Sequence, residues 1–356
     1  MKKRSTLFSI ITIAIGLILM TVSLASCSFK FKDLDKSEYD SNTYEISDPF
    51  NNISIVSNTA DITFVKAEGE NTSVVCFDHK KMPHTVSVKD GTLTISIDDE
   101  RKWFDHIMPF STSTPTITVY LPEGEYGALS VSSDTSDVAI PSGFTFESIN
   151  VSLDTGDVCC SANVKDFIKV KASTGDVSFS DMSANNVEIS LSTGDVTLKK
   201  CSFGSVKTKT STGNQIASDL IIDNAFTLEV SSGDTDIKTV NCKSFTSIGS
   251  TGEISLENVT VTETLFIERS TGDVEIECCT AGYMSVKTST GDVEFDRSDA
   301  GDIYAKTSTG DVEGSLLTSK IFITSTNTGK VRVPASTSGG ICEITTTTGD
   351  IKITTP

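Results

Sequence analysis

The sequence predicts an all-β protein, a single-chain parallel β-helix (β-solenoid) with rungs of 19–20 residues and the usual right-handed coil. The first observation behind this prediction is a Ser-Thr-Gly-Asp-Val signature whose glycines recur every 19 or 20 residues. The second is an alternation of apolar and polar residues on both sides of each glycine, which is typical of a strand, a tight turn and a second strand. Such units must stack, because a lone pair of strands buries too little apolar surface to be stable.

The repeated glycines are expected to be structural. They are Gly156, Gly175, Gly194, Gly213, Gly233, Gly252, Gly272, Gly291, Gly310, Gly329 and Gly349. A sharp reversal at Thr-Gly-Asp needs a residue with positive φ, which glycine adopts without a Cβ clash. We therefore expect a β-branched residue at any of these positions to strain the rung.

Three columns of residues are expected to face the core. They lie seven and five residues before each glycine and two residues after it. The first column is apolar in every rung, whereas Gln215 and Thr235 interrupt the last one. The column six residues before each glycine faces outward and is irregular, with residues as different as Lys169 and Phe266. Binding specificity is expected on such outward columns and on the segment from Asp98 to Pro115.

Residues 45–140 are predicted to form irregular rungs of the same solenoid, and residues 141–356 the regular ones. Alternating segments lie at 52–56, 61–65, 93–97 and 116–120. The segment from Asp98 to Pro115 lacks clear alternation and holds the single tryptophan, Trp103. We interpret it as a loop or short helix over the open N-terminal end of the solenoid, with an exposed contact patch as the alternative.

Residues 1–27 are predicted to be a lipoprotein signal peptide or a membrane anchor. A basic start precedes an apolar run from Leu7 to Val22, and Leu24-Ala25-Ser26-Cys27 has the pattern that lipoprotein signal peptidase reads. Cys27 is then the lipidation site, and residues 28–44 are a linker. The alternative is an uncleaved single-pass anchor. Both interpretations predict export and anchoring in the cell envelope, and the lipoprotein is favoured.

The formal net charge is −19, from 48 acidic and 29 basic residues. Nucleic acid and anionic bilayers repel such a surface, so neither is expected as the main partner. Contact with a membrane is expected only through the N-terminal lipid or helix.

Aspartate follows the repeated glycine in eight of eleven rungs, and Asn214, Glu253 and Lys330 replace it in the others. A column of bound calcium ions is one interpretation. The other is that each carboxylate accepts hydrogen bonds from turn amides or from nearby hydroxyl groups. The second is favoured, because Lys330 within the column does not fit continuous metal sites.

The histidines and the cysteines are not predicted to form a metal or cofactor site. His79, His84 and His106, with Cys76 and Asp105, have a spacing that fits no compact ligand motif. We expect surface histidines, no metal site and no cofactor. The cysteines are expected to be mostly free, buried thiols: Cys201 and Cys279 lie four rungs apart, roughly 19 Å, beyond the reach of a disulfide.

No catalytic residue is predicted, and the protein is not expected to be an enzyme. Polysaccharide-cleaving β-helices set carboxylates in a groove formed by long loops. Here the segments between the signatures are short and nearly uniform from 150 to 349, and no paired acid and base stands out.

The chain resembles the bacterial "putative adhesin" family of exported or membrane-anchored β-solenoid domains of unknown function. The resemblance covers residues 45 to 356. It depends on the repeated Ser-Thr-Gly-Asp-Val, on Asp90-Gly91-Thr92-Leu93-Thr94-Ile95 and on Val119-Tyr120-Leu121-Pro122. It implies a cell-envelope protein named for adhesion, and the family has no established catalytic residues to carry over.

These observations favour a cell-surface binding or scaffolding protein whose partner is an extracellular glycan, matrix or protein ligand. The alternatives are an envelope-stress sensing or regulatory ectodomain and a polysaccharide-active β-helix enzyme. The last rung in the sequence ends at Pro356, half a turn after Gly349. An open parallel edge there invites pairing with another chain, so we expect either that Pro356 blunts the edge or that the protein associates end to end.

Overall fold

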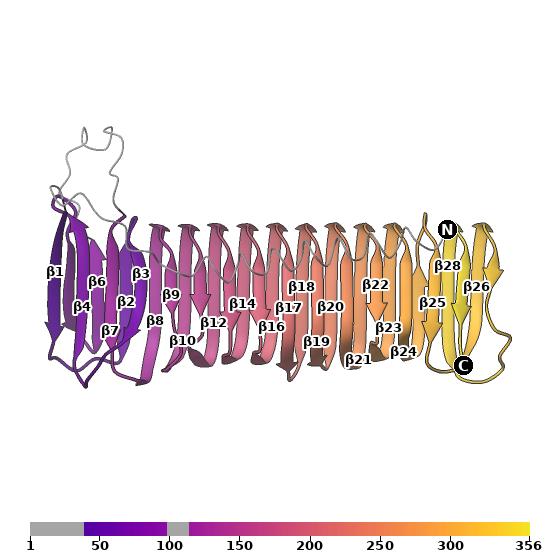
Figure 1. Cartoon of the computed structure of the whole chain (residues 1–356), viewed down its shortest axis with the longest axis horizontal. Helices are drawn as coiled ribbons and strands as arrows, with labels where there is room; N and C mark the ends of the chain where they lie inside the picture. The colour runs from indigo at the N-terminus through magenta and orange to yellow at the C-terminus, as the bar shows by residue number, and fades with distance from the viewer. Residues whose placement is uncertain (1–38, 98–113) are drawn as a thin grey trace.

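The chain forms a rod of stacked β-strands (Figure 1). In this computed structural model the structure describes residues 39–97 and 114–356. All regular secondary structure in these two ranges is strand, and the 29 strands form one continuous sheet that coils through about 12 turns. The predicted all-β solenoid with parallel stacked strands is thereby confirmed. The described residues contain no apolar helix of membrane-spanning length.

Each regular rung consists of a long stretch of strand, the Thr-Gly-Asp turn and a shorter stretch. The strands are β10 (Phe144–Thr155), β11 (Val158–Cys160), β12 (Asn163–Thr174), β13 (Val177–Ser180), β14 (Ser183–Thr193), β15 (Val196–Lys199), β16 (Ser202–Thr212), β17 (Gln215–Ile222), β18 (Ala225–Ser232), β19 (Thr235–Cys242), β20 (Ser244–Thr251), β21 (Ile254–Thr271), β22 (Val274–Glu277), β23 (Thr280–Thr290) and β24 (Val293–Lys306). Equivalent residues of successive rungs pair in parallel, as Val151 pairs with Val170.

The predicted inward columns fill the centre of the rod. In the column seven residues before each glycine, every side chain is buried except Phe322, which is half-buried. The polar exceptions bond to one another inside: the Thr208 hydroxyl donates to Oε1 of Gln215, and Nε2 of Gln215 donates to Thr210 Oγ1 at 3.2 Å. Thr208, Thr210 and Gln215 are thus satisfied by one another and, for Nε2 of Gln215, also by the Glu229 carbonyl oxygen of the next rung.

Arg269 lies in the rod interior, which the sequence did not reveal. It is 3% exposed, and its Nη2 donates to Thr235 Oγ1 at 3.1 Å and to Ser247 Oγ at 2.9 Å. Gly249 leaves room for it, because a Cβ there would lie 2.7 Å from Nη1 of Arg269. Burial lowers the pKa of Arg269 to about 10. The small polar residues that interrupt these inward columns thus form the binding pocket of one buried guanidinium.

The turn glycines have a second cause besides the one predicted. Ten of the eleven have positive φ, between 130° and 153°. In addition, a Cβ on Gly194 would lie only 2.0 Å from the carbonyl oxygen of Gly175 in the preceding rung. The same clash recurs along the column, so the glycines permit both the turn and the close stacking of turns.

The opposite corner of the regular rungs uses non-glycine residues in the left-handed region. Their φ angles lie between 47° and 57°, at Asp181, Lys200, Asp219, Thr239, Asn258, Cys278 and Arg297. Aspartate and asparagine tolerate this conformation, whereas lysine, threonine and arginine adopt it at a cost. The stacked neighbours on both sides hold these corners in place.

The N-terminal end is a mixed cap. Its strands are β1 (Tyr39–Ile46), β2 (Asn52–Ser57), β3 (Asp61–Lys66), β4 (Thr72–His79), β5 (His84–Lys89), β6 (Thr92–Ile97), β7 (Thr116–Leu121), β8 (Gly124–Thr135) and β9 (Val138–Ile140). The four predicted alternating segments are confirmed as β2, β3, β6 and β7. However, β4 pairs antiparallel with both β1 and β7, and β5 pairs antiparallel with β6. The expectation of purely parallel irregular rungs is therefore wrong here, and β1 begins within the stretch predicted as a linker.

The C-terminal rungs are out of sequence order in space. Their strands are β25 (Val312–Leu316), β26 (Lys320–Thr328), β27 (Val331–Arg332), β28 (Gly340–Thr348) and β29 (Ile351–Thr354). The last segment of the chain lies between its two predecessors, because β28 pairs with both β24 and β26, and β29 with both β25 and β27 (Figure 1). The open edge is therefore the outer C-terminal rung, β26 and β27. The expectation that this edge lies beside Pro356 is wrong.

A glycine corner explains this order. Gly340 stacks on Gly301, where a Cβ would lie 1.7 Å from the Gly301 carbonyl oxygen. The equivalent residue of the outer C-terminal rung is Lys320, which pairs with Gly340. Lysine has no room directly beside Gly301, so the rung that carries it takes the outside position.

Lys320 reaches back across the rung formed by β28 and β29, called the inserted rung below because it lies between the two rungs that precede it in the sequence. Its ammonium group contacts Asp299 Oδ1 at 2.7 Å and donates to the carbonyl oxygen of Ala300. The side chains of Lys320 and Asp299 are both almost fully buried. The other oxygen of Asp299, Oδ2, is buried without a hydrogen-bond partner in the described part of the chain. This ion pair fastens the outer C-terminal rung to the body of the rod.

Seven cysteines in the described ranges are free, and six of them are buried: Cys76, Cys160, Cys201, Cys242, Cys279 and Cys342. Burial raises the pKa of the Cys160 and Cys242 thiols to about 12. The prediction of free, buried thiols is confirmed for these six. They pack as small apolar residues and stay protonated at neutral pH.

Candidate functional site

The aspartates that follow the turn glycines form a hydrogen-bonded ladder along the rod. Oδ1 of each accepts the backbone N–H of the equivalent residue in the next rung, as Asp157 accepts from Asp176 at 2.8 Å. One part of the ladder runs from Asp61 to Glu253 and the other from Asp273 to Lys330. The favoured interpretation, hydrogen bonds from turn amides, is confirmed, although the donor belongs to the neighbouring rung.

Lys330 ends this ladder. Its N–H donates to Asp350 Oδ1 at 2.8 Å, and Asp350 lies in the inserted rung. The sequence placed Lys330 inside the column, which is wrong because its rung is the outermost one. Among the described strands no further rung offers an N–H there, so this position needs no acceptor and a lysine is tolerated.

The ladder predicts how stability depends on pH. Burial raises the pKa of Asp61, Asp157 and Asp195, and neighbouring ladder carboxylates add to the rise. The folded rod therefore binds these protons more readily than the unfolded chain. This contribution to stability is complete below the pKa of an unfolded aspartate, about 3.9, and is lost as pH rises through the folded values.

We expect Asp195→Asn to raise the melting temperature at pH 7 and to flatten its pH dependence above about pH 4. Asparagine keeps the acceptor oxygen and removes the charge, as Asn214 does naturally when it accepts from Asp234 at 2.9 Å. Thermal unfolding at a series of pH values measures the effect. Asp154→Asn, an exposed position outside the ladder, is the matched control, and an equal change in both variants contradicts the prediction.

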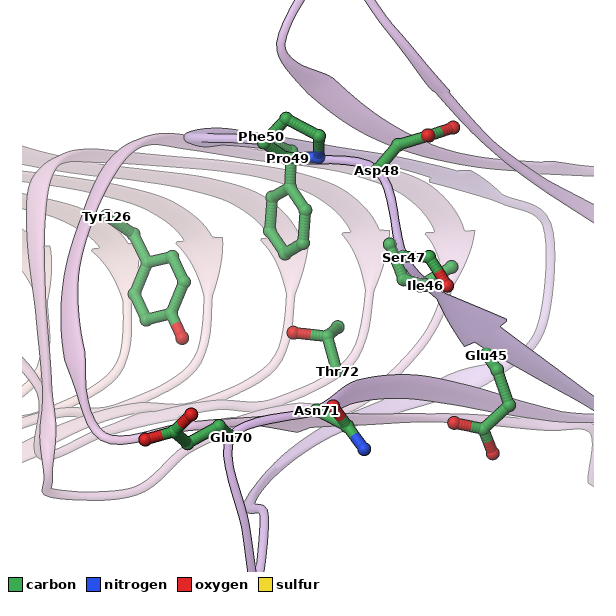
Figure 2. Close-up of a pocket in the computed structure, with 10 residues that line it drawn as sticks. All are labelled: Glu45, Ile46, Ser47, Asp48, Pro49, Phe50, Glu70, Asn71, Thr72 and Tyr126. Atoms are coloured by element: carbon green, nitrogen blue, oxygen red, sulfur yellow. The ribbon is translucent and has the colours of Figure 1, made fainter.

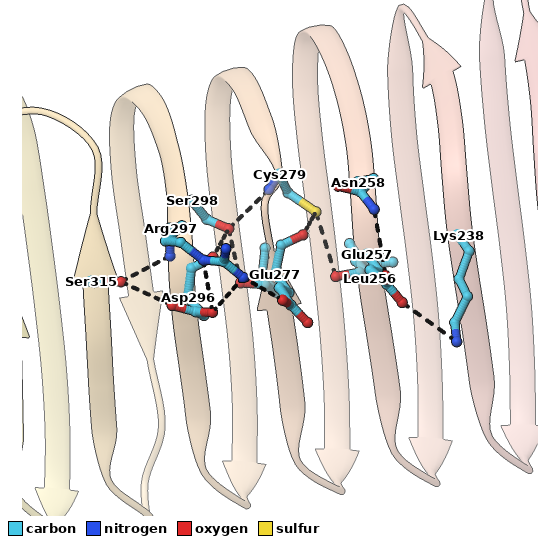
Figure 3. A network of polar contacts seen from close by, with 11 residues as sticks. Lys238, Leu256, Glu257, Asn258, Glu277, Cys279, Asp296, Arg297, Ser298 and Ser315 are labelled. Atoms are coloured by element: carbon cyan, nitrogen blue, oxygen red, sulfur yellow. Dashed lines mark hydrogen bonds and ion pairs between the residues drawn. The ribbon is translucent and has the colours of Figure 1, made fainter. Parts of the chain in front are cut away.

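The outward faces carry paired charges. Lys169 contacts Glu188 across one rung step at 3.0 Å, and Figure 3 shows Arg297 bridging Glu277 at 2.6 Å and Asp296 at 3.1 Å. In the same view Cys279 and Ser298 bond to backbone groups at the corner: the Cys279 N–H donates to Ser298 Oγ at 3.0 Å. The outward ion pairs are largely exposed and contribute little to stability individually.

One outward patch is aromatic. Phe266 and Tyr304 lie two rungs apart on β21 and β24, and Nζ of Lys287 lies 5.5 Å and 5.8 Å from their ring centroids. Tyr283 is 42% exposed nearby. The residues six before each turn glycine do form an outward column here, as predicted from the sequence. After Tyr304, however, the next residue in this column is Glu343 and not Ile323, because the inserted rung lies between them.

The N-terminal cap holds a cavity of about 560 Å³. Figure 2 shows the rings of Phe50 and Tyr126 and the hydroxyl of Thr72 pointing into it. The two rings stack with centroids 6.3 Å apart, and the Tyr126 hydroxyl donates to the carbonyl oxygen of Pro122 at 2.7 Å. Three separate segments thus meet here: the β1–β2 connection, the start of β4 and β8.

The electrostatics of this cavity are acidic. Glu45, Asp48 and Glu70 line it, and none of the described lining residues is basic. Two ring faces beside several oxygen acceptors suit a polyhydroxylated or cationic ligand and disfavour an anion. Sequence reasoning missed this site, because its residues come from segments far apart in the chain.

The sequence predicted surface histidines, and His84 contradicts this. It is 2% exposed. Its Nδ1 lies 2.6 Å from Asp78 Oδ1 and its Nε2 lies 3.0 Å from Ser57 Oγ. The buried thiol of Cys76 completes the group. The structure therefore brings together two of the five residues considered from the sequence, Cys76 and His84.

The other predicted residues are placed as follows. His79 is partly exposed at the end of β4. Cys27, Asp105, His106 and most of the segment from Asp98 to Pro115 lie outside the described residues. Their predicted roles, lipidation for Cys27 and a covering loop for the segment, stay predictions.

A family model described as "Toastrack DUF4097" matches residues 50–247 and residues 241–356. No curated protein matches the chain.

Similar solved structures include three named for adhesion. A "putative adhesin" from Bacteroides fragilis is 13% identical, with 90% of this chain and 98% of that chain covered and a TM-score of 0.34. A "putative adhesin" from Parabacteroides distasonis is 14% identical, with 89% and 98% covered and a TM-score of 0.32. A "putative cell adhesion protein" from Clostridium sporogenes is 10% identical, with 90% and 100% covered and a TM-score of 0.24. Scores this low say nothing about a ligand or an activity.

Proposed function

Because the chain belongs to the Toastrack DUF4097 family, we propose that it is an adhesin-like binding protein of the bacterial cell envelope that acts without catalysis. The observation that carries this proposal is the cavity of the N-terminal cap, where Phe50 and Tyr126 face acidic side chains on a rigid frame. The ligand we propose is a neutral glycan.

The chemistry of the cavity supports this ligand class. The C–H faces of a sugar ring pack on aromatic faces, and its hydroxyl groups donate to carboxylate oxygens such as those of Glu45 and Glu70. A volume of about 560 Å³ lies in the range of small-ligand sites. The acidic lining disfavours sulfated or uronic glycans.

Anchoring through Cys27 is part of the proposal. A lipid on Cys27 tethers the N-terminal cap and lets the rod extend from the membrane, so that many copies present the same cavity and weak contacts add up. Labelling with a fatty-acid analogue in the wild type and in Cys27→Ser measures the acylation, and equal label in both rejects it.

We also propose end-to-end self-association, now through the outer C-terminal rung. That edge exposes Ile321, Ile323 and Val331 beside Lys330 and Arg332, whereas β1 at the opposite end exposes acidic Glu45, and Asp40, which Lys80 contacts at 3.8 Å. The opposite charges favour head-to-tail contact. Sedimentation velocity over a range of protein concentrations measures it, and a monomer at every concentration rejects it.

A glycan panel tests the main proposal. We expect the full chain to bind neutral glycans and to release them chemically unchanged. Phe50→Ala should weaken the affinity for the best-bound glycan at least about tenfold, which equals about 1.4 kcal/mol of binding free energy. Tyr283→Ala removes an exposed aromatic ring far along the rod and is the matched control. Release of shortened oligosaccharides contradicts the non-catalytic role, and equal binding by wild type and Phe50→Ala contradicts the site.

A further inference from the structure

A buried group of three metal-binding side chains lies in the N-terminal cap, apart from the glycan cavity. Cys76 and Asp78 are on β4 and His84 begins β5. Their exposed fractions are 0%, 1% and 2%. Each offers one donor atom, and the three donor atoms lie within 4.8 Å of one another. We propose that Cys76, Asp78 and His84 bind a divalent transition-metal ion of the zinc class.

The strand geometry explains why these side chains meet. Alternation along β4 turns both Cys76 and Asp78 toward the interior. The chain then reverses and brings His84 back, and the carboxylate of Asp78 fixes this reversal by accepting the His84 backbone N–H at 2.8 Å on Oδ2. Two of the three ligands are thereby held in place by the backbone before any ion arrives.

The charge balance favours a divalent ion. A deprotonated Cys76, an ionised Asp78 and a neutral His84 carry a total charge of −2, which an ion of charge +2 neutralises. The side-chain partner that the structure gives the Asp78 carboxylate is His84, whose Nδ1 lies 2.6 Å from Asp78 Oδ1. Sulfur, nitrogen and oxygen donors together are the set that zinc accepts.

A tetrahedral ion requires the three donor atoms, which lie within 4.8 Å of one another, to adjust their separations. Metal–ligand bonds of about 2.0 to 2.3 Å place the donors roughly 3.4 Å apart. Nδ1 of His84 and Oδ1 of Asp78 are 2.6 Å apart, so the ion takes the place of the proton between them and this separation widens.

One neighbour orients the imidazole of His84, and a second holds its backbone. With the ion on Nδ1, the Nε2–H donates to Ser57 Oγ, which lies 3.0 Å away. The Tyr44 hydroxyl donates to the carbonyl oxygen of His84 at 2.9 Å. An outer partner on the second ring nitrogen, here Ser57, fixes the tautomer and the angle of a metal-bound histidine.

Ser57, His84 and Asp78 also have the connectivity of a nucleophile, a base and an orienting carboxylate. Ser57 is 3% exposed, however, and an acyl substrate has no way to its hydroxyl group. The serine is therefore assigned to positioning His84 and not to catalysis.

Cobalt(II) binding tests the proposal, because a thiolate ligand adds a charge-transfer band to the cobalt spectrum. We expect the full chain, stripped with a chelator, to bind one Co²⁺ with this band, and Zn²⁺ to displace it. Cys76→Ser should abolish the band and weaken Zn²⁺ binding by more than the 10–100-fold typical of losing an outer partner. Ser57→Ala should keep the band and weaken binding within that range.

Cys242→Ser is the matched control, because Cys242 is also free and buried but lies in the regular rungs. It should leave stoichiometry and spectrum unchanged. Far-UV circular dichroism of each metal-free variant verifies folding, and if His84→Gln fails to fold, Cys76→Ser decides the matter because it changes a single atom. Absence of stoichiometric Co²⁺ uptake by the wild type, or an unchanged band in Cys76→Ser, overturns the proposal.

Discussion

Gly194→Val is expected to lower the free energy of unfolding by more than about 4 kcal/mol and to unfold the rungs around it. Few single substitutions have so large an effect. Gly194 has a φ of 140°, which a β-branched residue does not adopt without strain. A Cβ there would also lie 2.0 Å from the carbonyl oxygen of Gly175. The backbone has no room to move away, because Gly213 stacks on the other side with the same close approach.

Chemical denaturation and hydrogen exchange measure this effect. Because each rung contacts only its neighbours, the loss should be strongest in β12 to β17 and fade toward the ends of the rod. Gly69→Ala is the matched control, since a Cβ there meets nothing within 4 Å. If the free energies of unfolding of the two variants differ by less than about 1 kcal/mol, the difference lies within the usual range for single substitutions. Such a result contradicts the close-stacking explanation.

Lys320→Met is expected to cost about 3 to 5 kcal/mol, because it leaves the charge of Asp299 buried without its partner. The loss should appear as detachment of the outer C-terminal rung, with fast hydrogen exchange in β26 and β28. Adding Asp299→Asn removes the orphaned charge and should recover most of the stability, because asparagine still accepts the Ala300 N–H that Asp299 Oδ1 now accepts at 2.8 Å.

Lys352→Met is the control for Lys320→Met. Lys352 contacts Glu313 at 3.0 Å, but both side chains are about half exposed, so its loss should cost less than about 1 kcal/mol. A double variant no more stable than Lys320→Met alone contradicts the orphaned-charge explanation. Equal costs for the two lysine variants contradict the role of burial.

The regular rungs could be predicted from the sequence because each rung repeats the same physical constraints. The columns that contain Ile149 and Val151 alternate with outward residues in every rung, and the turn requires glycine. The left-handed corner was less visible. Only its aspartate and asparagine members, such as Asp181 and Asn258, are typical of that conformation.

The order of the last rungs could not be read from periodicity. Ile303, Phe322 and Cys342 are all apolar, so the inward column fits either order. Two residues that depart from the repeat indicate the order of the last rungs: Lys330 in the aspartate ladder and Lys320 opposite Gly340. Both mark the rung that has no neighbour on one side.

The candidate sites were hidden for another reason. Phe50, Glu70 and Tyr126 are brought together by the antiparallel cap, and so are Ser57 and His84. A repeat predicts contacts between equivalent positions of neighbouring rungs. It predicts nothing about contacts where the repeat is absent, and both sites lie there.

The inserted last segment determines how such a rod can become longer in evolution. β29 offers no free edge, because it is flanked by β25 and β27, and the open edge lies one rung further out on β26 and β27. At the N-terminal end, β2 is likewise flanked by β6 and β8. Duplication of one 19- or 20-residue unit among the regular rungs therefore lengthens the rod and leaves the N-terminal cap and the open edge on β26 and β27 unchanged.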